Sequence, residues 1–226
     1  MAAHGKQFTL FASLGPNPWK VTALLHELGM ENSYEIVYLN QLKGETKDES
    51  HTKYNPNGRV PTLIDHSNGD FVVWESGAIL EYLVEKYDTK RKVSFEKLEE
   101  KIQAQQYLFF QTSGQGPYFG QALWFWKFHS EKLPSAVERY TKEMERIISV
   151  VDKILEGKDY LVGNKFSYAD ISFLVWWPVV DWMSSEVTEL QGWREKYPNV
   201  SRWDIAIQKR PAIAAALKER DAYRAQ

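Results

Sequence analysis

The chain has 226 residues, 43% hydrophobic and 26% charged, which is ordinary for a globular protein of one or two domains. The formal charge of -2 gives no sign of a nucleic-acid partner, because such partners favour a basic surface. Cysteine is absent, so disulfides, zinc–thiolate sites and a protein thiol nucleophile are excluded. With no signal-peptide pattern and no apolar run of about 18 residues, we expect a cytoplasmic protein that does not span a membrane.

The first half of the chain alternates between strand and helix patterns. Residues 8–11 favour a strand, and a helix follows from Pro18 to its stop at Gly29. Residues 33–39 have an alternating pattern, with Tyr34, Ile36 and Tyr38 on one face, that predicts a second strand, parallel to the first through a crossover. The polar stretch 41–53 is expected to be a mobile helix or loop.

Pro61 precedes a short β-favouring run, residues 62–65. Proline cannot donate to a sheet ladder, so it fits only at the start of a strand. If the bond before Pro61 is cis, the chain turns sharply and the N–H and C=O of Val60 point away from the sheet. These groups would then suit an extended, peptide-like ligand.

A second recognition element follows a predicted hairpin. Asn68-Gly69 favours a tight turn between residues 62–65 and 71–74, and an amphipathic helix begins at Glu75-Ser76 and runs to residue 87. A helix N-terminus with a hydroxyl binds a carboxylate, and a neighbouring Glu can hold an ammonium. Both charges together describe the free end of an α-amino acid, so we predict a small peptide ligand.

The second half of the chain shows helical periodicity only. Ser167 and Asp170 form a capping signature at the start of an apolar helix that we expect to continue through residue 180. Pro211 separates two shorter helices near the end of the sequence. The other predicted helices cover residues 95–110, 134–156, 200–209 and 212–221.

Three motifs occur in order: P-N-x-x-K-V at 16–21, N-P-N-G-R-V-P at 55–61 and W-E-S-G-A-I-L-E-Y-L at 74–83. Together they resemble the glutathione transferase family, especially the fungal members related to the yeast nitrogen-regulatory prion protein. The resemblance covers most of the chain and is strongest from residue 8 to 87. The predicted order β-α-β-(α)-β-β-α also agrees with the thioredoxin-like half of that fold.

The resemblance implies an α/β thioredoxin-like domain over residues 1–88 that binds glutathione, a linker over 89–94 and an all-α domain over 95–226 with a hydrophobic substrate pocket. It implies a cytoplasmic detoxification enzyme that conjugates the glutathione thiolate to small apolar electrophiles. Glutathione is then a co-substrate, and a homodimer is expected. Neither a nucleic acid nor a membrane is an expected partner.

The thiol of the ligand needs activation, because a free thiol with a pKa near 8.5 is mostly protonated at neutral pH. Residues 8–20 contain no Tyr, which leaves Ser13 and Asn17 as hydrogen-bond donors. The fungal relatives use the Asn of P-N-x-x-K-V, so the resemblance favours Asn17. The alternative is that Asn17 only caps the first helix.

The resemblance also assigns the other contacts to glutathione. Arg59 and Val60 correspond to the cysteinyl part, and Glu75 with Ser76 to the γ-glutamyl end. At the glycine end, Thr46 stands where the relatives have Gln or His. Either Lys43 contacts that carboxylate or a water molecule bridges it.

The aromatic residues beyond position 114 suggest a site for the second substrate. Tyr118 and Phe119 are the first candidates for its wall, followed by Trp124. The alternative is that these rings belong to the core or to a dimer contact. The five His residues show no metal-binding spacing, so no metal site is predicted.

Three other functions stay open from the sequence. A disulfide reductase of this fold can use glutathione without any protein cysteine. A non-catalytic regulatory or binding protein can use the same scaffold, although the Asn/Gln-rich extension of the yeast regulator is absent from this sequence. A translation-factor subunit has a similar N-terminal domain, but we expect no room here for its additional domain.

Overall fold

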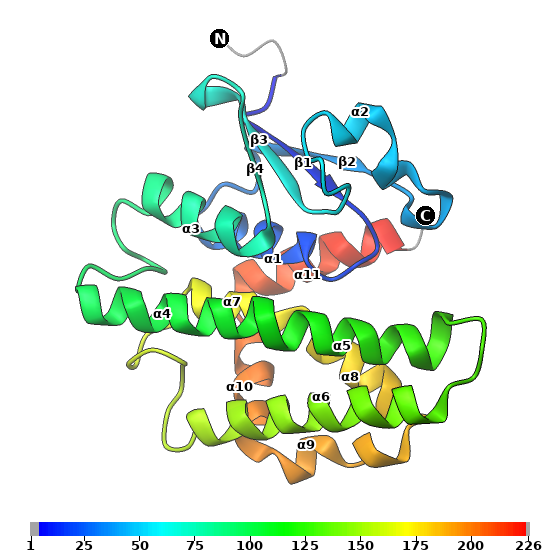
Figure 1. Cartoon of the computed structure of the whole chain (residues 1–226). Coiled ribbons are helices and arrows are strands. Elements are labelled where there is room, and N and C mark those ends of the chain that lie inside the picture. Colours follow the sequence, from blue (N-terminus) through cyan, green and yellow to red (C-terminus); the bar gives the residue numbers. More distant parts are fainter. Residues whose placement is uncertain (1–4, 225–226) are drawn as a thin grey trace. The chain divides into compact units, whose positions relative to one another are not determined.

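The computed structural model describes residues 5–224 and forms two compact units. The first consists of Met1–Ser94 and Arg210–Gln226, and the second of Phe95–Lys209 (Figure 1). Residues 1–4, part of the segment where we expected no signal peptide, lie outside the described range. Among the described residues, no helix combines the length and the apolar character needed to cross a bilayer.

A single four-stranded sheet organises the first unit. Its strands are β1 (Phe8–Ala12), β2 (Tyr34–Tyr38), β3 (Thr62–Asp65) and β4 (Phe71–Trp74), in the order β2-β1-β3-β4. β1 is parallel to β2 and antiparallel to β3, and β4 is antiparallel to β3. The inner strands β1 and β3 are buried at every position. The predicted thioredoxin-like order of elements along the chain, β-α-β-(α)-β-β-α, is confirmed.

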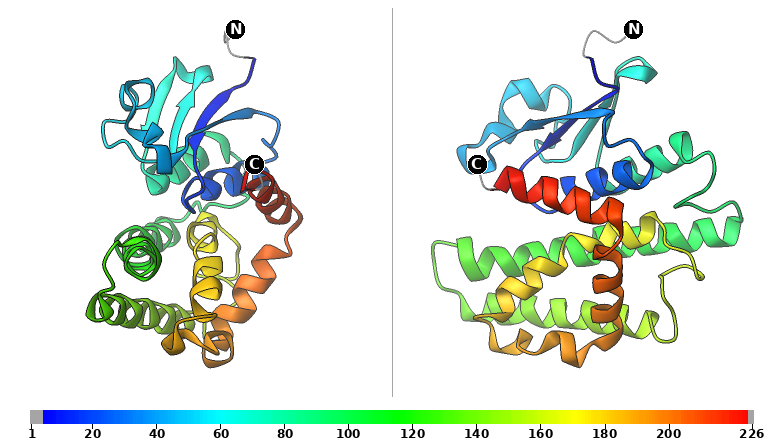
Figure 2. Two further views of the ribbon diagram at one scale, coloured as in Figure 1. Left: turned by 90° about the vertical axis from the view of Figure 1, so that its right-hand side faces the viewer. Right: turned by 180° about the vertical axis from the view of Figure 1, so that it is seen from behind.

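Helices cover this sheet. α1 packs against β1, α3 and α11, and these three helices lie on one side of the sheet (Figures 1 and 2). Phe8 faces this side, because its ring contacts Tyr87 of α3. By strand alternation Phe11 faces the other side, where it forms a small buried cluster with Leu39 and Ile64. The helical segments of the unit are α1 (Pro18–Glu27), η1 (Gln41–Lys43), η2 (Glu45–Lys47), α2 (Glu49–Thr52), η3 (His66–Asn68), α3 (Ser76–Tyr87) and α11 (Pro211–Arg224).

The last helix does not belong to the second unit, although we expected the helical domain to extend to residue 226. Arg210 donates from Nε and Nη2 to the buried carboxylate of Glu27, at 2.7 and 3.0 Å. The ring of Tyr223 on α11 lies 5.9 Å from that of Trp19 on α1. These long-range contacts attach α11 to the first unit, and no local sequence signal announces them.

The connection between β3 and β4 also differs from the predicted two-residue turn. The structure has the 3₁₀ turn η3 followed by Gly69 and Asp70, both with positive φ. Asp65 stabilises the turn by accepting a hydrogen bond from the N–H of Ser67 at 3.0 Å. The carboxylate at the end of β3 thus favours a longer connection than Asn68-Gly69 alone predicts.

The second unit is helical, as expected. A continuous helical run begins with α4 and includes two π-helical segments, η4 and η5, so it continues beyond residue 110, where the predicted helix was expected to end. Its elements are α4 (Leu98–Phe110), η4 (Gln111–Gln115), α5 (Gly116–Leu123), η5 (Trp124–Phe128), α6 (Pro134–Ile154), α7 (Tyr168–Leu174), α8 (Trp177–Ser184), η6 (Thr188–Leu190), α9 (Trp193–Lys196) and α10 (Pro198–Gln208).

The predicted capping box at the start of α7 is confirmed, since Ser167 and Asp170 exchange side-chain and backbone hydrogen bonds. The apolar helix after it is not continuous to residue 180. Pro178 has no N–H to donate to the carbonyl of Leu174, and α7 ends at Leu174. A second helix, α8, then begins at Trp177.

Candidate functional site

The register of the sheet brings three loops of the first unit together. Thr62, the first residue of β3, is paired with Phe11 near the end of β1 and with Trp74 at the end of β4. The loop before β3, the loop after β1 and the start of α3 therefore meet at one edge of the sheet. One predicted motif, 55–61, lies in the loop before β3, and the other two begin in the loop after β1 and at the junction of β4 with α3.

The loop before β3 exposes backbone hydrogen-bonding groups. The peptide bond between Val60 and Pro61 is cis, as the sequence allowed, and β3 begins only at Thr62. Within the described residues 5–224, the N–H and C=O of Val60 have no hydrogen-bond partner. The side chain of Val60 packs against the cluster of Phe11, Leu39 and Ile64. The packed side chain thus holds the Val60 backbone in place, and its N–H and C=O remain available to a ligand.

A buried polar network fixes this loop. The Asn55 amide donates to the C=O of Arg59 at 2.7 Å and to Oγ1 of Thr62 at 2.9 Å. His51 links Thr62 Oγ1 (3.0 Å) to the C=O of Thr46 (2.9 Å). A carbonyl only accepts, so Nδ1 of His51 carries the proton and Nε2 accepts from the Thr62 hydroxyl.

The sequence analysis did not single out His51 or the side chain of Asn55. A His eleven residues before a Thr is no motif, and only the folded loop shows why these residue types are needed. Gly58 in the same loop has a φ of 58°. A Cβ there would lie 2.7 Å from Cδ of Lys47 and 3.0 Å from the C=O of Thr46, so the backbone conformation and the crowding both favour glycine.

The start of α3 has an unusual backbone. Glu75 has a φ of 71°, which is rare for a residue other than glycine, and its side chain makes no capping hydrogen bond. Ser76, the first residue of α3, is buried, with 6% of its surface exposed. Strained backbone of this kind is concentrated at functional sites, which agrees with the predicted role of Glu75 and Ser76.

A buried lysine lies beneath this helix start. Nζ of Lys20, on α1, donates to Oγ of Ser76 at 3.2 Å, and the side chain is only 1% exposed. Burial lowers the pKa of Lys20 to about 7, and the negative charge of Glu75 opposes part of this shift. Lys20 stands in the P-N-x-x-K-V motif, but the sequence analysis assigned it no role.

The two candidates for thiol activation have different environments. Ser13 is 0% exposed, and its Oγ accepts from the N–H of Gly15 at 3.3 Å and lies 3.5 Å from Oε1 of Gln41. Asn17 is half-buried at the start of α1 and makes no side-chain capping hydrogen bond there. The simple capping role for Asn17 is therefore wrong, and Asn17 is the more accessible donor.

The two predicted cationic contacts are exposed. Lys43 is the last residue of η1, and Arg59 precedes Val60 in the loop before β3. The side chains of both residues are accessible to an anionic ligand, whereas the nearby Lys47 donates to the C=O of Asn57 at 2.8 Å.

The three aromatic candidates of the second unit have different environments. Phe119 is 0% exposed and packs edge-on against Trp176 and Trp177, so it is a core residue and not a wall of a pocket. Tyr118 is half-buried beside Tyr140, and Trp124 is exposed. Helical periodicity alone did not indicate which ring faces inward.

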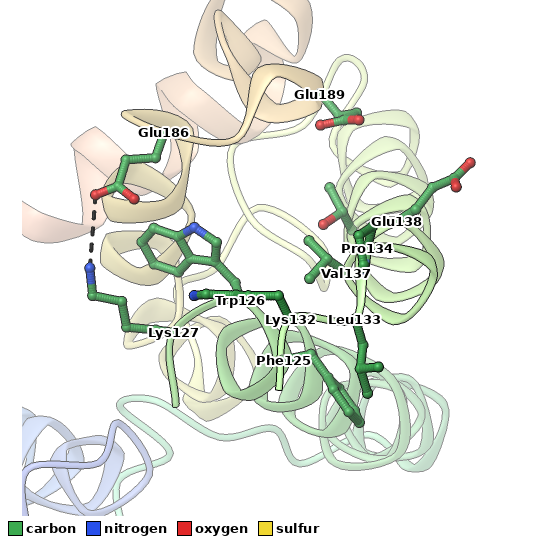
Figure 3. A pocket seen from close by; sticks show the side chains of 11 residues that line it. Phe125, Trp126, Lys127, Lys132, Leu133, Pro134, Val137, Glu138, Glu186 and Glu189 are labelled. Carbon is green, nitrogen blue, oxygen red and sulfur yellow. Dashed lines mark ion pairs between the residues drawn. The ribbon is translucent and has the colours of Figure 1, made fainter. Parts of the chain in front are cut away.

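A cavity of about 390 Å³ lies elsewhere in the second unit (Figure 3). Trp126 and Val137 line it together with charged residues, and Lys127 pairs with Glu186 across 3.9 Å at its edge. None of the predicted site residues lines this cavity. Among the described residues, no group of three or more His, Asp or Glu side chains is arranged to hold a metal ion.

Comparison with known proteins gives matches along most of the chain. The family model for the glutathione S-transferase N-terminal domain matches residues 6–85, and that for the C-terminal domain matches residues 117–211. Glutathione S-transferase 1 of Schizosaccharomyces pombe is 45% identical over 224 residues, which covers 95% of this chain and 96% of that protein.

Solved structures match equally well. Glutathione transferase URE2P6 from Phanerochaete chrysosporium, in complex with oxidized glutathione, has a TM-score of 0.90 and 46% identity over 98% of this chain and 99% of its own. Ure2p5 from the same fungus, cocrystallized with 1-(S-glutathionyl)-2,4-dinitrobenzene, has a TM-score of 0.89 and 48% identity, covering 99% of both chains.

The buried network makes a testable prediction about the loop before β3. Replacing Asn55 by Ala leaves buried partners unsatisfied and lowers the free energy of unfolding by about 2 kcal/mol. It also accelerates amide exchange at Asn57, whose N–H is bonded to Oδ1 of Asn55. Urea unfolding and hydrogen exchange measure both effects. The exposed Asn57→Ala variant is the control, and equal stability of the two variants would contradict the prediction.

Proposed function

The chain belongs to the glutathione transferase family, as its motifs predicted, and we propose which of its residues bind glutathione and activate the thiol. The protein is a glutathione transferase with glutathione as co-substrate. The observation that carries the proposed site is the meeting of the unpaired Val60 backbone with the start of α3 at one edge of the sheet.

We assign the γ-glutamyl end of glutathione to Glu75 and Ser76. The N-terminus of α3 offers unpaired N–H groups and a hydroxyl to the carboxylate, and the exposed Glu75 carboxylate suits the ammonium. The cysteinyl residue then pairs with the N–H and C=O of Val60 like an added strand. Arg59 and Lys43 supply positive charge toward the peptide and its glycine carboxylate.

Asn17 is the proposed activator of the thiol. Its amide donates a hydrogen bond and cannot lose a proton, so it stabilises the thiolate without competing for the proton. Its position at the start of α1 adds the positive end of the helix dipole. Ser13 is instead assigned a structural role in the loop after β1, because its buried Oγ already accepts a hydrogen bond from the N–H of Gly15.

The proposed second substrate is a small apolar electrophile. From the second unit, Tyr118 and Trp124 have the exposed surface needed to contact it. Flat aromatic electrophiles pack well on such rings. The chain's contribution to catalysis is then the formation of the thiolate and its proximity to the electrophile.

A homodimer is supported by an exposed apolar stripe on α4. Leu98, Ile102 and Phe109 follow one another by four and seven residues, so they lie on one helix face, and all three are more than half exposed. Apolar surface of this kind is typical of an interface. The cytoplasmic location stays a prediction.

Disulfide reduction is the second candidate, because URE2P6, 46% identical to this chain, was crystallised with oxidized glutathione. Side-by-side assays separate the two activities. We expect conjugation of 1-chloro-2,4-dinitrobenzene with glutathione to exceed reduction of a small glutathione-mixed disulfide. Faster disulfide reduction would favour the reductase. Glutathione binding without either turnover would favour a regulatory protein.

A pair of variants tests the thiol assignment. Asn17→Ala removes the donor to the thiolate and raises the thiol pKa in the complex by about one unit, so turnover at neutral pH falls about tenfold. The pH profile of kcat with 1-chloro-2,4-dinitrobenzene measures this shift. Ser13→Ala is the control, and we expect it to leave the pKa of the bound thiol unchanged. A shift in the Ser13 variant alone would reverse the assignment.

A charge on α4 tests the dimer. Ile102→Glu places a carboxylate in the apolar stripe and is expected to convert a dimer to a monomer, because an unpaired charge is costly to bury. Ile205→Glu, on an exposed position of α10, serves as the control. Light scattering after gel filtration measures the mass of each. A monomeric wild-type protein, or a dimeric Ile102→Glu variant, would exclude this interface.

A further inference from the structure

Lys20 is an unusual residue to find in the interior of a domain. Lysine is rarely fully buried, and Lys20, on α1, is 1% exposed. Its Nζ reaches Oγ of Ser76, the first residue of α3, at 3.2 Å. It therefore lies directly behind the hydroxyl that we assign to the γ-glutamyl carboxylate.

Charged side chains of the described residues lie on two of the elements packed against α1. Glu75, at the start of α3, is the charged group that favours the cationic form of Lys20. β1, which also packs against α1, carries only Phe, Thr, Leu and Ala. On α11, Glu219 is bonded to Tyr34 and lies 3.4 Å from His26, and Arg220 is paired with Asp221.

We propose that Lys20 is a positioning residue whose protonation controls the affinity for the γ-glutamyl end of glutathione. The proposal rests on the assignment of that end to Glu75 and Ser76. As a cation, Lys20 adds a buried positive charge behind the N-terminus of α3, and it attracts the ligand carboxylate through Ser76.

The hydroxyl of Ser76 supplies the mechanism. An ammonium has donors only, so it donates to Oγ of Ser76 and leaves the Ser76 O–H to donate to the carboxylate. A neutral amine has a lone pair, and the Ser76 O–H then turns inward to donate to it. Loss of one proton from Lys20 thus removes both the charge and the aligned donor.

The direction of the pH effect follows from linkage. In the free protein, burial lowers the pKa of Lys20 to about 7. A carboxylate on Ser76 favours the cation and raises this pKa, so binding takes up a proton. Affinity is full below the pKa of the free protein and is lost as the pH rises through the higher pKa of the complex. A rise of about one unit corresponds to about a tenfold loss of affinity.

Calorimetric titration with S-hexylglutathione tests this in the full chain. The thioether has no thiol to ionise, so thiol activation does not contribute to the pH dependence. From about pH 6 to pH 9 the wild-type affinity is expected to fall about tenfold. Near pH 7.5, two buffers with different heats of ionisation should report uptake of about half a proton.

Three variants identify the group. Lys20→Met keeps a side chain of similar length without charge, and it should bind about tenfold more weakly at pH 6. Ligand binding to this variant should no longer include the proton that Lys20 takes up in the wild type. Lys20→Arg stays cationic at every pH used, so it should restore tight binding, again without that proton uptake. Lys218→Met, an exposed lysine on α11, should behave like the wild type.

The outcomes separate this inference from the proposed function. If the wild type does not bind S-hexylglutathione at all, the assigned glutathione site fails. If it binds, and folded Lys20→Met keeps the wild-type proton uptake and pH profile, the site stands and the role of Lys20 is overturned. Thermal unfolding of each variant shows that it is folded at the pH used. If neither Lys20 variant folds, the wild-type protein is titrated with S-hexylcysteinylglycine, an analogue that lacks the γ-glutamyl residue. A proton uptake equal to that with S-hexylglutathione then overturns the role of Lys20.

Discussion

The register of the sheet is the constraint on which the site depends. Because Thr62 is paired with both Phe11 and Trp74, three chain segments that are distant in the sequence end at one edge. A shift of one residue would turn the side chains of β3 to the opposite faces and separate Val60 from the start of α3. The buried inner strands make such a shift costly, since β1 and β3 are covered on both faces. The hydrophobic core thereby fixes the geometry of a polar site.

Polar groups then hold what the sheet brings together. The loop before β3 is not a regular element, and its shape is maintained by Asn55, His51 and Thr62 in the interior. These bonds satisfy buried donors and acceptors that would otherwise destabilise the fold. They also leave the backbone of Val60 unpaired at the surface. A rigid loop with free backbone groups binds a peptide at a lower entropic cost than a flexible loop.

Local signals predicted much of this protein, and long-range packing accounts for what they missed. Pro61, the Glu75-Ser76 pair and the Ser167–Asp170 box act within a few residues, so the sequence alone indicates their structure. The position of α11 and the burial of Phe119 depend on partners far along the chain. Helical spacing shows that rings share a face, but it does not show which face is covered. Tyr118 and Phe119 are adjacent, yet only Phe119 is part of the core.

The start of α3 illustrates how stability is exchanged for binding. A side chain that caps a helix N-terminus contributes about 1 kcal/mol, and α3 lacks such a cap. Glu75 also has a positive φ, which adds strain. Together they leave the first N–H groups of the helix without a side-chain cap. The buried Lys20 adds positive charge at the same point. In the proposed complex, the γ-glutamyl carboxylate would relieve the uncapped helix and the buried charge together, so we expect the features that weaken the free protein to strengthen the complex.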